Sequence, residues 1–235
     1  MPRHLRILVA GHPFHVIQRG VNRSICYTDD GDRTLFLGLL RELSSLHGCS
    51  LHAYVLMGNH FHLLVTGREP DSVSIMMKNL GQRYVQFFNR KHRRSGTLWE
   101  GRYRSSLVDS EGYLFTCQRY IEMNPVRARM VEHPGQYEWS SYRANAGVLR
   151  DDLVTPHRLY LRLGENHSQR TQAYGDLFDD SLAERELRLI RDCANGGFAL
   201  GRSVYLDEMK QRLKRSVTAG VSGRPRKNVG AETVV

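Results

Sequence analysis

The chain has 235 residues and a formal net charge of +10, because 34 Lys and Arg outnumber 24 Asp and Glu. This length supports one sizeable hydrophobic core with a smaller appendage and needs no disulfide staples. The four cysteines are scattered without a C-x-x-C pair, which excludes a zinc knuckle and a disulfide framework and favours a reducing, cytoplasmic setting. No apolar run approaches the length of a membrane span, so we expect no membrane association, and the excess positive charge indicates a polyanionic partner such as nucleic acid.

The first expected elements are a strand and a long helix. A strand is expected at Phe14–Arg19, and the polar stretch after it contains Asp29 and Asp30, either of which is suited to cap a helix. Apolar residues then recur at helical spacing through Arg33–His47, which predicts an amphipathic helix.

A hairpin follows, with two histidines on its second strand. Aromatic and β-branched residues predict strands at Cys49–Met57 and His60–Thr66, and Gly58-Asn59 falls at the turn between them. Residues two apart on a strand face the same side, so His60 and His62 present their imidazoles together. Two imidazoles at one point are the beginning of a metal site, although a pair of half-buried sheet histidines is the plainer interpretation.

A second predicted helix begins after Pro70-Asp71 and ends in the basic cluster Arg90-Lys91-His92-Arg93-Arg94, and a strand is expected at Tyr103–Val108. Such a charge run suits either a solvated helix end or contacts to phosphates. Basic residues interleaved with aromatic rings offer charge for phosphates and ring faces for bases, as in single-strand binding surfaces. The DNA-binding residues predicted in this region are Arg90, Lys91, Arg93, Arg94, Trp99, Arg102 and Arg104.

A third helix is predicted over Glu111–Met123 and ends at Asn124-Pro125. Tyr113, Tyr120 and Asn124 fall on one stripe, since four and seven residues return to nearly the same azimuth. The element order is then strand, helix, strand, strand, helix, strand, helix. It fits an α+β fold, a ferredoxin-like antiparallel sheet with helices packed on it.

The rest of the chain is expected to be organised differently. Residues 1–146 form the main domain, which an aromatic segment at 134–146 completes, and 147–180 is typical of a linker. Within 181–217 two short helices around a Gly-containing turn suit either a helix-turn-helix or a plain helical hairpin. The basic tail 218–235 is expected to be disordered.

The tail carries one short motif. Gly223-Arg224-Pro225-Arg226-Lys227 resembles an AT-hook core, in which an extended Arg-Pro-Arg lies in the narrow minor groove of duplex DNA. The alternative is a solvated basic tail. Arg224, Arg226 and Lys227 are therefore further candidates for DNA contacts.

The histidine pair and the tyrosine helix together suit phosphoryl transfer. A phenol is a weak nucleophile at its free pKa of roughly 10, and metal or base assistance allows it to attack. Tyr120 is the candidate nucleophile, although a packed aromatic is the common role of a helical tyrosine. Asn124 offers an amide oxygen as a third ligand beside His60 and His62, a set that suits Mg²⁺ or Mn²⁺ better than structural Zn²⁺.

Two stretches resemble one family. Met57-Gly58-Asn59-His60-Phe61-His62 resembles the HUH motif of single-tyrosine, IS200-like transposases, and Tyr120-Ile121-Glu122-Met123-Asn124-Pro125-Val126-Arg127-Ala128 resembles their catalytic-tyrosine helix. The Trp99-Glu100-Gly101-Arg102 stretch and the order of elements also fit, so the resemblance covers roughly Phe14–Ala146. Within the family the chain looks most like the REP-associated tyrosine transposases, which process hairpin-forming repetitive extragenic palindromes.

The resemblance implies an HUH nuclease fold and a transposase-type reaction on single-stranded or hairpin DNA. Tyr120 would attack the backbone, form a 5′-phosphotyrosine link and release a 3′-hydroxyl, with His60, His62 and Asn124 as metal ligands. We expect the protein to act as a monomer or a homodimer. The chain departs from the family at Gly58, where Pro is usual, and at Arg129, where Gly is frequent.

Two other classes of function are compatible with the sequence. A non-catalytic DNA- or RNA-binding regulator would explain the charge and the aromatics and would leave the histidines as sheet packing. A metal-dependent hydrolase that uses a metal-bound water would keep the histidines and leave Tyr120 without a role. A covalent protein–DNA adduct separates the three, since only the transposase forms one.

Overall fold

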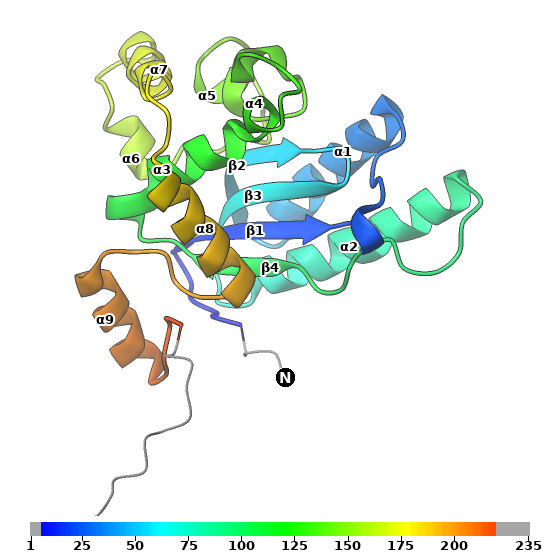
Figure 1. Ribbon diagram of the computed structural model, residues 1–235, viewed down its shortest axis with the longest axis horizontal. Coiled ribbons are helices and arrows are strands. Elements are labelled where there is room, and N and C mark those ends of the chain that lie inside the picture. The colour runs from blue at the N-terminus through cyan, green and yellow to red at the C-terminus, as the bar shows by residue number, and fades with distance from the viewer. Residues whose placement is uncertain (1–5, 220–235) are drawn as a thin grey trace, which may run out of the picture.

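The computed structural model describes residues 6–219, and a four-stranded antiparallel sheet lies at the centre of this part of the chain (Figure 1). In spatial order the strands are β2 (Cys49–Leu56), β3 (His60–Gly67), β1 (Pro13–Arg19) and β4 (Arg104–Leu107). The inner strand β1 is hydrogen-bonded to both β3 and β4. This order confirms the α+β, ferredoxin-like fold that the sequence predicts.

Two long helices cover one face of the sheet. α1 (Asp30–Leu46) and α2 (Ser72–Lys91) pack against each other and against the strands (Figure 1). Phe36 of α1 and Tyr84 of α2 are fully buried in one cluster with Phe61 of β3. This face therefore holds the larger part of the hydrophobic core.

The opposite face carries α3 (Ser110–Glu122) and α8 (Glu184–Gly196). Cys117 of α3 and Ile190 of α8 share a second buried cluster with Leu64 of β3. Because strand side chains alternate between faces, Phe61 points toward α1 and α2, whereas its neighbours in β3 point toward α3 and α8.

Helix boundaries follow the expected capping chemistry. The carboxylate of Asp29 accepts a hydrogen bond from the N–H of Asp32 at the start of α1, and that of Asp109 accepts one from the N–H of Glu111 in α3. Each side chain satisfies an N–H that the first turn of a helix leaves without a partner.

Short elements connect these helices and strands. They are η1 (Val21–Arg23), α4 (Asn124–Arg127), η2 (Pro134–Gln136), α5 (Tyr142–Asn145), α6 (Arg158–Leu161), α7 (His167–Asp176) and α9 (Ser203–Leu213). The aromatic segment 134–146 runs along the outer edge of β2, where Leu56 N–H donates to Trp139 O and Ser141 N–H to Tyr54 O. It thereby covers one exposed edge of the sheet.

The region 147–180 differs from the expected linker, because it contains helices with buried side chains. Tyr160 of α6 and Tyr174 of α7 are buried, and the Tyr174 hydroxyl donates to the carboxylate of Glu122 at 2.7 Å. These contacts attach the region to the end of α3.

The region 181–217, which the sequence predicts to be a small helical part, is also packed on the main domain. Ile190 of α8 is fully buried against α3, and Leu200 is hydrogen-bonded to both Leu107 and Asp109 beside β4. An amphipathic helix of this length needs a surface on which to bury its apolar side, and the sheet supplies it. Within residues 6–219, no helix combines the length and the apolar character that crossing a membrane requires.

Arg129 occupies a left-handed backbone conformation directly after α4, with φ of 56°. This conformation costs an L-residue about 1–2 kcal/mol, and glycine adopts it freely. We expect Arg129→Gly to raise the free energy of unfolding by about 1 kcal/mol and the melting temperature with it. Arg129→Ala keeps the strained conformation, so it serves as the control and should give no increase. A glycine variant no more stable than the alanine variant would contradict this explanation.

Candidate active site

A cavity of about 530 Å³ opens between the ends of the inner strands, α3 and α8. His60 and His62 line it from β3, Tyr120 from α3 and Asn124 from the first residue of α4. The structure thus brings together the four residues that the sequence singled out as nucleophile and metal ligands.

The two histidines share the sheet face that α3 covers. His60 and His62 have ring centroids 5.2 Å apart, and the ring of His62 lies 5.7 Å from that of Tyr120. Alternation along β3 gives this placement, since Phe61 between them points into the core on the other face.

The turn before the histidines is held from outside the hairpin. Cys26 N–H donates to Gly58 O at 2.8 Å, and Gly20 N–H donates to Asn59 O at 2.9 Å. Gly58 stands where the related motif usually has Pro, and these two bonds restrain the turn that Pro would otherwise stiffen. The histidine pair is therefore anchored by the chain that follows β1.

Each of the two histidines has one ring nitrogen engaged. Nδ1 of His60 lies 2.7 Å from Oδ1 of Asn59, and Nδ1 of His62 lies 2.8 Å from Nε2 of His15, a buried histidine on β1. The Nε2 atoms of His60 and His62 are left for the cavity. Burial lowers the pKa of His60 to about 4, with a smaller contribution from Arg19, and burial also holds the pKa of His62 well below its usual range.

His15 was not singled out by the sequence. Its ring plane lies within 14° of that of His62, and its centroid lies 5.7 Å from that of Tyr120. A histidine at the second position of an expected strand is only weak evidence, in the sequence, for a role in the site. Only the register of β1 against β3 shows that it meets His62.

Tyr120 is held by groups from the turn that follows α3. Nη2 of Arg127 donates to the Tyr120 carbonyl at 2.6 Å, and its guanidinium lies 4.3 Å from the centre of the tyrosine ring. Nδ2 of Asn124 donates to the same carbonyl at 3.1 Å, which leaves its Oδ1 as a free acceptor. The Asn-Pro-Val-Arg stretch therefore folds back on the tyrosine that precedes it.

The competing tyrosine does not reach the site. Tyr113 lies two turns before Tyr120 on α3, but it packs beside the buried cluster that includes Leu114, and the cavity is lined by Tyr120 alone of the two. Seven residues advance a helix by about 10 Å, so a shared azimuth does not place both rings at one end of the sheet.

A buried carboxylate fixes the end of the tyrosine helix. Glu122 is fully buried and accepts hydrogen bonds from Ser141 Oγ at 2.5 Å, Asn145 Nδ2 at 2.8 Å and Tyr174 at 2.7 Å. Burial raises the pKa of Glu122 to about 7, against the lowering effect of these three donors. Residues 141–174 thus hold α3 two residues beyond Tyr120.

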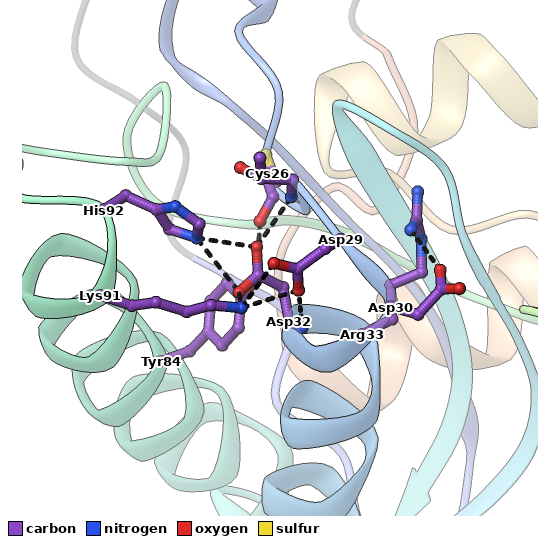
Figure 2. A network of polar contacts seen from close by, with 9 residues as sticks. Cys26, Asp29, Asp30, Asp32, Arg33, Tyr84, Lys91 and His92 are labelled. Carbon is purple, nitrogen blue, oxygen red and sulfur yellow. Dashed lines mark hydrogen bonds and ion pairs between the residues drawn. The ribbon is translucent and has the colours of Figure 1, made fainter.

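The basic cluster at the end of α2 divides into two groups. Figure 2 shows Lys91 and His92 pointing at Asp32 of α1. Nζ of Lys91 lies 2.7 Å from Asp29 and 2.8 Å from Asp32, and Nε2 of His92 lies 2.9 Å from Asp32. The carboxylate of Asp32 is fully buried, so it needs these cationic partners. Lys91 therefore forms ion pairs that link α2 to the start of α1, contrary to its expected role as a phosphate contact.

The other members of the cluster are free to meet a ligand at the surface. Arg90, Arg93 and Arg94 are exposed at the end of α2. Trp99 requires a correction, because only 7% of it is exposed and its ring packs against Phe61. A core indole has no face to offer a base, so Trp99 stabilises the fold and does not form a stacking platform.

The cavity wall is strongly basic. Its described lining contains five arginines and a single carboxylate, that of Glu100; the arginines are Arg19, Arg102, Arg104, Arg127 and Arg191. Of these, Arg102 and Arg104 were predicted from the sequence. Arg19 could have been found from its place at the end of a predicted strand, whereas Arg191 belongs to a helix that only the tertiary structure brings to the site. Arg224, Arg226 and Lys227 lie outside the described residues.

The side chains that line the cavity include the three metal ligands that the sequence suggests. Among the described residues, no three or more His, Cys, Asp or Glu side chains are grouped as a metal site. His60, His62 and Asn124 do line the same cavity, and two imidazoles with one amide oxygen suit a divalent ion that keeps several water or phosphate ligands. The residues present therefore fit Mg²⁺ or Mn²⁺.

Fold and site together place Tyr120 beside a pair of histidines in an arginine-lined cavity. Residues 9–124 match the family described as "Transposase IS200 like". This segment is similar to the IS200-like transposases, and the match supports a transposase role for the chain. A comparison with curated proteins found no match.

Solved structures with a similar fold include one described as a REP-associated tyrosine transposase bound to a REP hairpin. It shares 15% sequence identity with this chain, with a TM-score of 0.54, and the match covers 68% of this chain and 93% of that one. A candidate transposase from Deinococcus radiodurans R1 is 22% identical, over 52% of this chain and 95% of its own, with a TM-score of 0.36. The first likeness supports the fold.

Proposed function

We propose that this protein is a metal-dependent transesterase that cleaves and rejoins single-stranded DNA through a 5′-phosphotyrosine intermediate at Tyr120. One observation carries the proposal: Tyr120, His60, His62 and Asn124 open into the same arginine-lined cavity. A phosphodiester is the anionic group that such a cavity suits, and the phenol is the nucleophile placed beside it.

In the proposed step the Tyr120 oxygen attacks the phosphorus of a phosphodiester. A new O–P bond joins the tyrosine to the 5′-phosphate, and the bond from phosphorus to the 3′-oxygen breaks. The phenol gives up its proton and the departing 3′-oxygen gains one. One phosphoester replaces another, so the reverse attack by a 3′-hydroxyl rejoins the strand.

His60, His62 and Asn124 would hold Mg²⁺ or Mn²⁺ through two Nε2 atoms and the amide oxygen. Such an ion would polarise the phosphate and stabilise the charge that develops on its oxygens. The guanidinium of Arg127 lies over the ring of Tyr120 and donates to its backbone carbonyl, so it supplies a cation near the developing phenolate. Burial lowers the pKa of Arg127 to about 10, which still leaves it protonated at neutral pH.

We propose hairpin-forming DNA with a single-stranded flank as the substrate, and the REP-associated tyrosine transposases as the subgroup. The sequence motifs support this, together with the fold shared with the hairpin-bound structure. Exposed Arg90, Arg93 and Arg94 at the end of α2 offer phosphate contacts outside the cavity. The protein would act as a monomer or a homodimer.

The test is incubation of the full chain with labelled hairpin oligonucleotides and Mg²⁺ or Mn²⁺, followed by a denaturing gel. A transesterase gives a slowly migrating protein–DNA adduct and a free 3′-hydroxyl end. A hydrolase gives cut DNA without an adduct, and a regulator gives a shift on native gels only. Either of the last two results would overturn the proposal.

His15 has a positioning role in this proposal. If the Nδ1–H of His62 donates to Nε2 of His15, the proton of His62 is kept off the Nε2 atom that faces the cavity. We expect His15→Leu to weaken Mn²⁺ binding about 10- to 100-fold, which paramagnetic resonance of free Mn²⁺ measures. His15→Gln supplies an amide oxygen as acceptor and should recover most of the affinity.

The matched control is His52→Leu, which removes another buried sheet histidine. Its ring bonds to Thr155 O and Thr66 Oγ1, away from the cavity. It should bind Mn²⁺ like the unaltered protein. Equal affinity in the His15→Leu and His52→Leu variants would remove the positioning role.

A further inference from the structure

Helix α8 lies outside the segment that matches the family, yet it forms part of the cavity wall. The family match ends at residue 124, and α8 spans Glu184–Gly196. Arg191 and Asn195 of α8 line the cavity together with Tyr120 and the histidines. Residues four apart share a helix face, so one face of α8 is turned toward the site.

The other side of α8 is firmly docked. Ile190 and Ala194 are fully buried, and Ile190 lies in the cluster formed with α3. The chain after α8 is tied down as well, because Leu200 is hydrogen-bonded beside β4 and Arg202 pairs with buried Asp109 at 2.7 Å. The position of Arg191 relative to Tyr120 is therefore set by the core.

In the described lining of the cavity, five arginines face a single carboxylate, that of Glu100. Nη1 of Arg127 is buried and has no hydrogen-bond partner among the described residues. Arg191 adds to the lowering of the pKa of Arg127, as a nearby like charge does. The acidic neighbour of Arg191 is the exposed Glu184. The distance from Nη1 of Arg191 to Oε1 of Glu184 is 3.7 Å, and such a surface ion pair is weak.

A third arginine is oriented by the same helix. Nη1 of Arg104 donates to Oδ1 of Asn195 at 2.5 Å. Cationic groups from β4, the Asn-Pro-Val-Arg turn and α8 thus meet at one wall of the cavity. Like charges repel unless an anion lies among them, and a guanidinium offers the paired donors that a phosphate accepts.

We propose that Arg191 of α8 and Arg127 form a binding site for a phosphodiester of the DNA strand, next to the phosphate that Tyr120 attacks. This rests on the proposed function, in which the cavity takes single-stranded DNA. The C-terminal helix then belongs to the substrate-binding surface of the enzyme, and Asn195 keeps Arg104 directed to the same strand.

The first experiment compares two arginines of one helix in the full chain. Arg191→Gln removes the cavity charge, and Arg188→Gln removes an exposed charge of α8 that does not line the cavity. Fluorescence anisotropy with a single-stranded oligonucleotide should show about tenfold weaker binding for Arg191→Gln, with a salt slope smaller by about 0.7. Arg188→Gln should change affinity less than about twofold.

A second experiment locates the contact on the strand. Single phosphates of the oligonucleotide are replaced in turn by uncharged methylphosphonates. At one position the replacement should weaken binding to the unaltered protein and leave binding to Arg191→Gln unchanged, because the two changes remove the same contact. Equal effects of Arg191→Gln and Arg188→Gln, or equal sensitivity of both proteins at every position, would overturn the proposal.

The covalent adduct distinguishes this inference from the function on which it rests. At saturating DNA, Arg191→Gln should still form the adduct, since Tyr120 is intact. If the unaltered protein forms the adduct but the two arginine variants bind DNA equally well, the proposed function is supported and the α8 binding site is overturned. If no adduct forms but Arg191→Gln binds DNA more weakly than Arg188→Gln, the proposed chemistry is overturned and the α8 binding site is supported.

Discussion

Tyr120→Phe should abolish the covalent protein–DNA adduct, a loss of at least about a thousandfold, because the substitution removes only the attacking oxygen. The phenyl ring keeps its place under Arg127 and beside His62, so melting temperature and hairpin binding should stay close to those of the unaltered protein. The adduct is measured on a denaturing gel with labelled hairpin DNA.

Tyr113→Phe is the matched control on the same helix. Tyr113 does not line the cavity, so this variant should form the adduct at the normal rate. Loss of the adduct with Tyr113→Phe and its retention with Tyr120→Phe would show that the nucleophile lies two turns earlier. Retention in both variants would exclude both tyrosines.

His60→Ala and His62→Ala should each reduce cleavage at least about a hundredfold, since each removes one of the two proposed imidazole ligands. Hairpin binding should largely persist, because the arginines and other phosphate contacts dominate affinity for DNA. Chelation by EDTA should stop cleavage by the unaltered protein, and added Mg²⁺ or Mn²⁺ should restore it. Cleavage rates and hairpin-binding isotherms of the same variants test whether cleavage is lost while binding persists.

His52→Ala controls for the loss of a buried imidazole from the sheet. Its ring bonds to Thr155 O and to Thr66 Oγ1 of β3, away from the cavity, so the variant should cleave once it is folded. Undiminished cleavage in either His60→Ala or His62→Ala, or cleavage that survives EDTA, would contradict the metal assignment. The Tyr120→Phe result would then decide between metal-free transesterification and a binding protein.

The single nucleophilic tyrosine limits what one chain does in one turnover. In the proposed mechanism, cleavage attaches Tyr120 to one 5′ end, and that site can rejoin only the strand ends it holds. Exchange of two strands therefore requires a second active site or a second turnover. A homodimer would contain that second active site, whereas a monomer would need the second turnover.

Local patterns in the sequence determined the elements of the sheet domain and the core of its site. The alternation around His60 and His62 placed both on one face, and helical spacing placed Tyr120 and Asn124 on one stripe. These are short-range regularities, and the backbone geometry of strands and helices alone produces them. The order of the elements was then enough to predict the ferredoxin-like fold.

Tertiary structure decided which of the remaining residues belong to the site. His15 meets His62 through strand register, and Arg191 arrives from 71 residues beyond Tyr120 in the sequence, because α8 buries its apolar side on the sheet. Lys91 and Trp99 looked like DNA contacts from composition, but a buried Asp32 and the aromatic core respectively engage them. Charge and ring content state what a residue is able to bind, whereas burial and nearby partners decide what it does bind, and those depend on long-range packing.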